Sequence, residues 1–243
     1  MKTKKIALLV VCVIALTACG LPVRFTEVRG SGNVITESRT VTGFNAVELS
    51  GIGTLIIEQS DKESLEITAE DNLMRHIKSE VSGSRLQLGG EDFVNLRPTR
   101  DIIYRLKVKN LRQIESSGLG KVELRNLETD DLAVEISGNG RISLEKLQAT
   151  DLTLEISGLG DVSINGKVKS QQIEISGAGN YKAPNLASES ARVDISGTGT
   201  AILWVTKQLD LDLSGAGTIH YYGSPMINSD ISGSGVVKNL GDK

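Results

Sequence analysis

The sequence predicts an all-β fold, a right-handed parallel β-helix with rungs of about 18–20 residues and a less regular N-terminal β region. The string Ser-Gly-x-Gly recurs eight times, and from the second copy onward its steps are 20, 20, 19, 20, 18 and 18 residues. Before each copy, apolar and acidic residues alternate with the period of a strand that buries one face. The copies begin at Ser50, Ser117, Ser137, Ser157, Ser176, Ser196, Ser214 and Ser232.

A signal peptide is expected at residues 1–18. Three lysines precede an apolar run over residues 6–16, which as a helix covers only about half of a 30 Å hydrocarbon core. That length is typical of a signal-peptide core rather than a membrane span. A short tether at 19–29 and a single domain at 30–240 then follow.

The segment Leu16-Thr17-Ala18-Cys19-Gly20 resembles the lipobox of bacterial lipoproteins. The resemblance implies that Cys19 becomes the first residue of the mature chain and carries the lipids. An ordinary secretory signal cleaved after Ala18 is the alternative. Cys12 leaves with the leader, so the mature chain has no second thiol for a disulfide.

Composition limits the function classes. The 243 residues include 26 glycines and only 4 prolines, which favours tight turns at regular intervals. The net charge of −3 and a pI near 5.6 provide no basic field for nucleic acid.

Each rung is expected to contain three short strands around a narrow core, with the glycines at a corner that needs positive φ or close approach of the backbone. A leucine-rich-repeat horseshoe is the alternative. It is disfavoured because the Asn that the repeat requires is Leu159 in one rung, and because no helical segment is available.

The irregular part, 30–110, leads into regular rungs at 111–240 without a linker. Strands are expected at 65–67, 86–88 and 102–108. A helical turn is expected between the first two, at 71–77, with Asp71 or Asn72 as its cap.

Several motifs together resemble the head GIN domain family. They are the opening Gly30-Ser31-Gly32-Asn33-Val34, the segments 41–53, 70–73 and 106–111, and the Ser-Gly-x-Gly ladder. The resemblance covers about residues 30–240 and implies a β-helical fold in a lipoprotein or secreted envelope protein. The family is named for the heads of autotransporter adhesins, which implies adhesion by analogy and supplies no catalytic residue.

One acid precedes each Ser-Gly-x-Gly by two positions, so stacked rungs should align these acids in a column. The column is a candidate for binding cations or for facing a ligand such as an anionic polysaccharide. The competing interpretation, which the sequence favours, is a solvated outer face. The candidate residues are Glu115, Glu135, Glu155, Glu174, Asp194 and Asp212, with Glu48 and Asp230 in the outer copies.

No catalytic or metal-binding constellation is evident in the sequence. His76 and His220 are far apart and have no metal-ligand spacing, and no cofactor motif occurs. A polysaccharide lyase or hydrolase is the alternative function, because β-helices host such enzymes. The aromatic residues of the late rungs would then form a small contact patch: Tyr181, Trp204, Tyr221 and Tyr222.

Together these observations predict a non-enzymatic adhesion or interaction module in the bacterial cell envelope. It would be held to a membrane by its N-terminal lipid, with the outer membrane favoured in a Gram-negative cell. The expected partners are a surface glycan or another envelope protein, and not nucleic acid.

Overall fold

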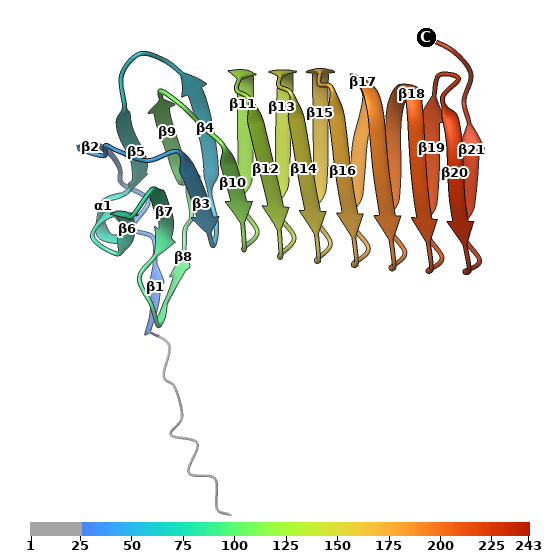
Figure 1. The fold of residues 1–243 in the computed structure, drawn as a ribbon. Coiled ribbons are helices and arrows are strands. Elements are labelled where there is room, and N and C mark those ends of the chain that lie inside the picture. The colour runs from blue at the N-terminus through green and yellow to red at the C-terminus, as the bar shows by residue number, and fades with distance from the viewer. Residues whose placement is uncertain (1–25) are drawn as a thin grey trace, which may run out of the picture.

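The computed structural model describes residues 26–243, and the expected signal peptide and Cys19 lie outside them. The described chain is a β-solenoid (Figure 1), which confirms the predicted fold class. A rung here means one turn of the chain around the solenoid, and rungs stack in parallel along its axis. The first described strand and the last one lie at opposite ends of the stack (Figure 1).

Two faces make up the solenoid. The acid-bearing face contains β6 (Ile77–Ser82), β7 (Arg85–Gly90), β3 (Ala46–Ser50), β10 (Gln113–Ser116), β12 (Asp131–Ile136), β14 (Asp151–Ile156), β16 (Ser170–Ile175), the later parts of β17 (Asn180–Ile195) and β18 (Thr200–Leu213), and β20 (Met226–Ile231). Of these pairings, only that of β6 with β7 is antiparallel.

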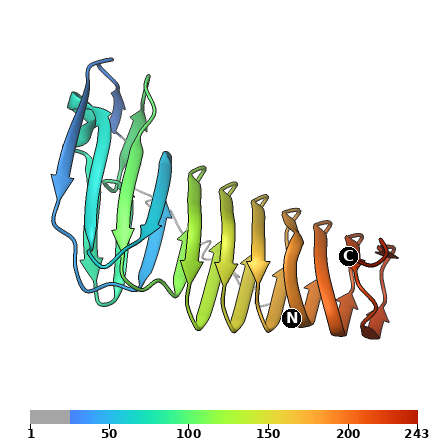
Figure 2. The ribbon, with the colours of Figure 1, turned by 90° about the horizontal axis from the view of Figure 1, so that it is seen from above.

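The second face contains β2 (Val34–Arg39), β5 (Ser64–Glu70), β9 (Ile103–Val108), β4 (Thr54–Gln59), β11 (Lys121–Glu128), β13 (Arg141–Gln148), β15 (Asp161–Lys167), the earlier parts of β17 and β18, β19 (Thr218–Tyr222) and β21 (Val236–Asn239). A separate two-stranded ribbon pairs β1 (Thr26–Arg29) with β8 (Val94–Arg97). Viewed from above, the N-terminal strands spread more widely than the rungs that follow (Figure 2).

The regular rungs up to β16 have two strand runs rather than the three predicted, and β17 and β18 each follow both faces as one continuous strand. In β11 the alternation of buried and exposed residues is broken at Arg125 and Asn126, which are both exposed. The register between β13 and β15 also shifts between Leu144 and Leu147. The second and third predicted strands therefore form one bent strand, because pairing with the adjacent rung resumes directly after the bend.

The core lies between the two faces. Ile136, Ile156, Ile175 and Ile195 stack in register and are almost fully buried, as the period-two pattern predicts. The N-terminal part continues this core without a break, because β3 pairs with β7 on one side and with β10 on the other.

The glycine corner depends on close approach. No glycine of the last seven Ser-Gly-x-Gly copies has positive φ, whereas Gly51 and Gly53 of the first copy do. A Cβ on Gly158 would overlap the carbonyl oxygen of Gly138, so the backbones of successive corners are in contact.

The predicted helical turn is α1 (Asp71–Met74), but its N-cap is Glu70, not Asp71 or Asn72. The Glu70 side chain does not cap α1 and instead accepts hydrogen bonds from other segments. Its carboxylate accepts from the N–H of Gly32 (2.6 Å), from the N–H of Thr99 (2.8 Å) and from the hydroxyl of Thr99 (2.6 Å). Glu70 thereby ties three segments of the irregular part together. No helix among residues 26–243 is both long enough and apolar enough to cross a membrane.

Candidate functional site

The predicted acids form one continuous column on the acid-bearing face. Each acid stands in register with the acids of the adjacent rungs. Both sequence neighbours of Glu155, for example, are buried, while Glu155 itself is exposed. In order along the stack, the column is Glu48, Glu115, Glu135, Glu155, Glu174, Asp194, Asp212 and Asp230.

The N-terminal end of the column has partners for its charges. The Arg85 guanidinium lies 2.5 Å from Oε1 of Glu115 and 4.0 Å from Oε2 of Glu48. Gln113 donates from Nε2 to Oε1 of both Glu115 (2.7 Å) and Glu135 (2.9 Å). Repulsion between neighbouring carboxylates is therefore compensated over the first three acids.

Burial nevertheless raises the pKa of Glu115. The Arg85 guanidinium opposes this shift, and the neighbouring charges of Glu135 and Glu48 add to it. The stacked carboxylates thus affect each other's titration, as expected for like charges at the strand spacing of about 4.8 Å.

The C-terminal part of the column is uncompensated. Among residues 26–243, the five acids from Glu155 to Asp230 form no ion pair. Beside the last of them is a shallow hollow of about 350 Å³, lined by Arg192, Asp210, Asp212, Asn228 and Asp230. This end of the column presents net negative charge to solvent and is the part best suited to a cationic partner.

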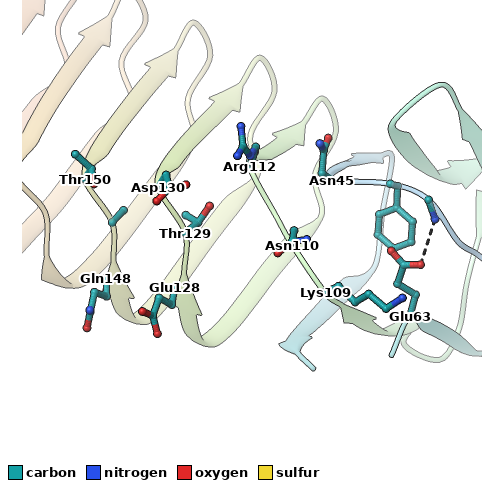
Figure 3. Close-up of a pocket in the computed structure, with 13 residues that line it drawn as sticks. Asn45, Glu63, Lys109, Asn110, Arg112, Glu128, Thr129, Asp130, Gln148 and Thr150 are labelled. Carbon is teal, nitrogen blue, oxygen red and sulfur yellow. Dashed lines mark hydrogen bonds between the residues drawn. The ribbon is translucent and has the colours of Figure 1, made fainter. Parts of the chain in front are cut away.

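A larger open groove follows the turns that lead into successive rungs (Figure 3). Its volume is about 820 Å³, and its lining is mostly polar. Lys109 and Arg112 contribute positive charge, and Glu128 and Asp130 negative charge. The N–H of Gly43 donates to Glu63 Oε2 at one end (3.1 Å). An open groove with alternating charges and amide and hydroxyl groups suits a hydroxyl-rich ligand better than an apolar one.

Sequence reasoning missed this groove. A signal for it was present in Asp130 and Thr150, two polar residues one rung apart. Each immediately precedes a strand of the acid-bearing face, and Asp131 pairs with Asp151 directly after them, so stacking places both along one corner of the solenoid.

The two histidines occupy separate places. The Nδ1 atom of His76 lies 2.8 Å from Glu91 Oε2, whereas His220 is on β19 in register with Ile202. Within the described residues, no three His, Cys, Asp or Glu side chains are arranged to hold a metal ion.

The aromatic residues of the late rungs do not share one surface. Tyr181 is fully buried and Tyr221 nearly so, while Trp204 and Tyr222 are partly exposed neighbours on β18 and β19. The Nζ atom of Lys243 lies 4.8 Å from the ring centroid of Tyr222 and 5.7 Å from that of Trp204. Of these four aromatic residues, only Trp204 and Tyr222 are available for surface contact.

The Tyr181 hydroxyl instead forms part of a buried polar network. It donates to Gln171 Oε1 (2.5 Å), Gln171 Nε2 donates to Ser188 Oγ (2.8 Å), and Ser188 donates to the carbonyl of Trp204 (2.9 Å). Desolvation raises the pKa of the Tyr181 hydroxyl, which therefore stays protonated. These groups hydrogen-bond one another inside the core, away from the surface.

Comparison with known proteins assigns the fold to a family. Over residues 43–225 the chain matches the model of a family described as "Putative auto-transporter adhesin, head GIN domain". It is similar to the solved structure of a "putative adhesin" from Bacteroides fragilis, with 28% identity and a TM-score of 0.84, over 88% of this chain and 100% of that one. A search of the curated proteins found no match.

Two other solved structures share the fold at lower identity. A "putative lipid binding protein" from Parabacteroides distasonis has 23% identity and a TM-score of 0.73, over 88% of this chain and 100% of that one. A "putative adhesin" from Parabacteroides merdae has 22% identity and a TM-score of 0.70, over 88% of this chain and 99% of that one.

Proposed function

Because the chain belongs to the head GIN domain family, whose model matches residues 43–225, we propose that it is a lipid-anchored, non-enzymatic adhesion or interaction module of the bacterial cell envelope. The family description and the Bacteroides fragilis relative support an adhesin-like role at the cell surface. The partner we propose is a surface glycan or another envelope protein.

The observation that carries the proposal is the repetition of the outer surface. Eight acids stand in register along one face, and the turn groove runs across the entries to neighbouring rungs. A surface that repeats at each rung matches a partner that also repeats, such as a polysaccharide. A catalytic centre, in contrast, requires one arrangement of unlike groups at a single place.

We propose that lipids on Cys19 anchor the chain to the membrane. The lipobox-like segment 16–20 precedes the described residues, so a tether of a few residues would connect the lipids to β1. Cys19→Ala should leave an unprocessed precursor and abolish metabolic labelling with a fatty acid. A Cys19→Ala chain that is still labelled and processed would overturn the lipid anchor.

The adhesive role is tested by displaying the full chain on a non-adherent bacterium and measuring binding to immobilised polysaccharides and to envelope extracts. We expect displaying cells to bind above the level of cells that carry the vector alone. A matched variant, Arg112→Glu with Asp130→Arg, alters the groove while conserving net charge and should bind less.

Binding unaffected by this charge exchange would exclude the groove, and no binding to any surface would exclude adhesion. The enzymatic alternative predicts instead that the purified chain releases reducing or unsaturated sugar ends from uronate-rich polysaccharides. Such release would overturn the non-enzymatic role.

A further inference from the structure

Among residues 26–243, nothing covers the C-terminal end of the solenoid core. Ile227 and Ile231 of β20 occupy inward positions in register with Leu209 and Leu213. Both isoleucines are 46% exposed, whereas the two leucines are fully buried. The large apolar side chains exposed on this last rung are Met226, Ile227, Ile231 and Val236.

The opposite end of the stack is covered by the chain itself. Helix α1 buries Leu73 and Met74 against the core. The Arg39 guanidinium crosses from β2 to donate to the carbonyls of Ile77 (2.6 Å) and Met74 (3.1 Å). Within residues 26–243, the C-terminal end has no comparable cover.

Within the part of the chain that the structure describes, the backbone of β20 is unpaired along the same edge. β20 pairs with β18 on one side, and the N–H of Ser232 donates back to the carbonyl of Leu213 (3.1 Å). Backbone groups alternate in direction along a strand, so the N–H and C=O groups of Ile227, Ser229 and Ile231 point to the free edge. A free edge of this kind is a template for pairing with another chain.

The side chains of β20 are arranged symmetrically about Ser229. An antiparallel pairing of two copies centred on Ser229 places Ile227 of each opposite Ile231 of the other. On the outer surface, the same register places the Asn228 amide opposite the Asp230 carboxylate. About six backbone hydrogen bonds would form, using the groups that the free edge leaves unpaired.

We propose that the C-terminal edge of the solenoid binds a second copy of this chain through antiparallel pairing of β20 with β20, with Ser229 on the two-fold axis. The pairing covers Ile227 and Ile231 and closes the edge in both copies, because a two-fold contact uses the same surface twice. It is independent of the adhesive role proposed above, since neither the turn groove nor the lipid takes part.

Charge and side-chain size favour a second copy in this orientation. A further rung stacked in parallel with an acid in the same position would place another carboxylate directly against Asp230, whereas antiparallel pairing places an amide there. Ser229 is also small where Leu211, one rung earlier, is large and buried. A small residue at the axis allows the two identical side chains to meet without overlap.

The test is cysteine cross-linking of the full chain on intact cells. In an antiparallel hydrogen-bonded pair the Cα atoms lie about 5.5 Å apart, which a disulfide spans. Ser229→Cys should give a covalent dimer under mild oxidation, while the parent chain and Ser234→Cys, an exposed position of the same rung, should not. Ser229 is exposed, so this substitution should leave folding intact.

A second variant tests whether the apolar contact drives pairing. Ile231→Lys in the Ser229→Cys background should lower the cross-linked fraction about tenfold, because it buries a charge opposite Ile227. Under reducing conditions, and at a concentration low enough to keep both variants monomeric, its melting temperature should match that of Ser229→Cys. Absence of the Ser229→Cys dimer, a stronger dimer with Asn228→Cys, or a dimer that persists in Ile231→Lys would each overturn the proposed pairing.

Discussion

A Cβ atom on Gly160 would lie 2.5 Å from Cγ2 of Ile136, one rung earlier in the stack. The same relation recurs between Gly199 and Ile175, at 2.5 Å, and between Gly217 and Ile195, at 2.6 Å. In six of the eight motifs the second glycine thus leaves room for the apolar side chain that precedes the motif in the rung before. This relation links the spacing of the repeat directly to the packing of the core.

Gly160→Ala should destabilise the solenoid by about 1–3 kcal/mol, because overpacking forces a shift in the Ile136 side chain or in the backbone. Urea denaturation of the purified chain measures the change. Leu159→Ala, at the exposed neighbouring position, should change stability by no more than about 0.5 kcal/mol. The cost of Gly160→Ala should also fall in an Ile136→Ala background, which removes the clashing methyl group. An undiminished cost there would contradict the packing explanation.

Ser116 occupies the position that is Ile136 in the next rung. It is almost fully buried, and its Oγ atom has no hydrogen-bond partner among the described residues. Removing an unpaired buried hydroxyl relieves its desolvation cost, so Ser116→Ala should raise the free energy of unfolding by about 1 kcal/mol. Ser137→Ala, at an exposed corner, is the matched control and should be neutral. A loss of stability in Ser116→Ala would show that the hydroxyl is hydrogen-bonded.

Tyr181→Phe should destabilise the chain by about 1–3 kcal/mol, because it leaves Oε1 of buried Gln171 without its donor. Gln171→Leu should also be destabilising, since the Tyr181 hydroxyl then loses its acceptor. The double variant removes both groups and should cost less than the sum of the single changes. Additive costs in thermal denaturation would indicate that the two groups act separately.

The sequence predicted the regular rungs well because the same interactions recur in each of them. The inward position of Ile156 and the outward position of Glu155 follow from period two alone. Gln171 breaks this pattern: it is polar yet occupies the core position in register with Leu152. Its partner Tyr181 lies on a different strand, and no local pattern predicts a hydrogen bond between two such positions.

The irregular part was predicted less completely because its extra strands do not repeat. The strands around 65–67, 86–88 and 102–108 were expected, but their pairing was not. β2 and β9 both pair antiparallel with β5, whereas β9 pairs parallel with β4. Alternation marks a strand without specifying its neighbour. The turn groove was missed for a related reason, since it forms only when polar turns from several rungs align.

Glu70 should make stability depend on pH. Hydrogen bonds, the largest from the Thr99 side chain, hold the pKa of Glu70 below its ordinary value of 4.5. The contribution of the ionised Glu70 carboxylate to the free energy of unfolding is therefore fully present above pH 4.5. It is lost as the pH falls through the lowered pKa. Glu70→Gln should lower the melting temperature at pH 7, and its deficit should shrink as the pH approaches 3.

Exposed Glu66→Gln provides the control and should show little deficit at either pH. Asp71, whose pKa is lowered chiefly by the Asn33 side chain, remains intact in both variants. The comparison therefore isolates the Glu70 carboxylate. A Glu70→Gln deficit that stays constant from pH 7 to pH 3 would contradict a role for its negative charge.

Neutralising acids of the column distinguishes a face that is only solvated from a face that binds cations. Neutralising Glu135, Glu155 and Glu174 together to Gln removes repulsion between stacked carboxylates, which is at most about 1 kcal/mol per pair in water. We expect stability to be unchanged or raised by up to that amount per relieved pair. If the column binds calcium, millimolar calcium should instead raise the melting temperature of the parent, and the triple variant should lose that gain.

The matched control changes three outward acids of β11 and β13 by the same total charge: Glu123, Glu128 and Glu145 to Gln. These residues do not stack on one another in the ladder, in which Glu123 faces Ser143 and Glu128 faces Gln148. Any gain that comes from relieved stacking should therefore appear in the column variant and be absent from the control. Equal gains in both would trace the effect to net charge, and a loss of stability confined to the column variant without calcium would show that the carboxylates stabilise the face they share.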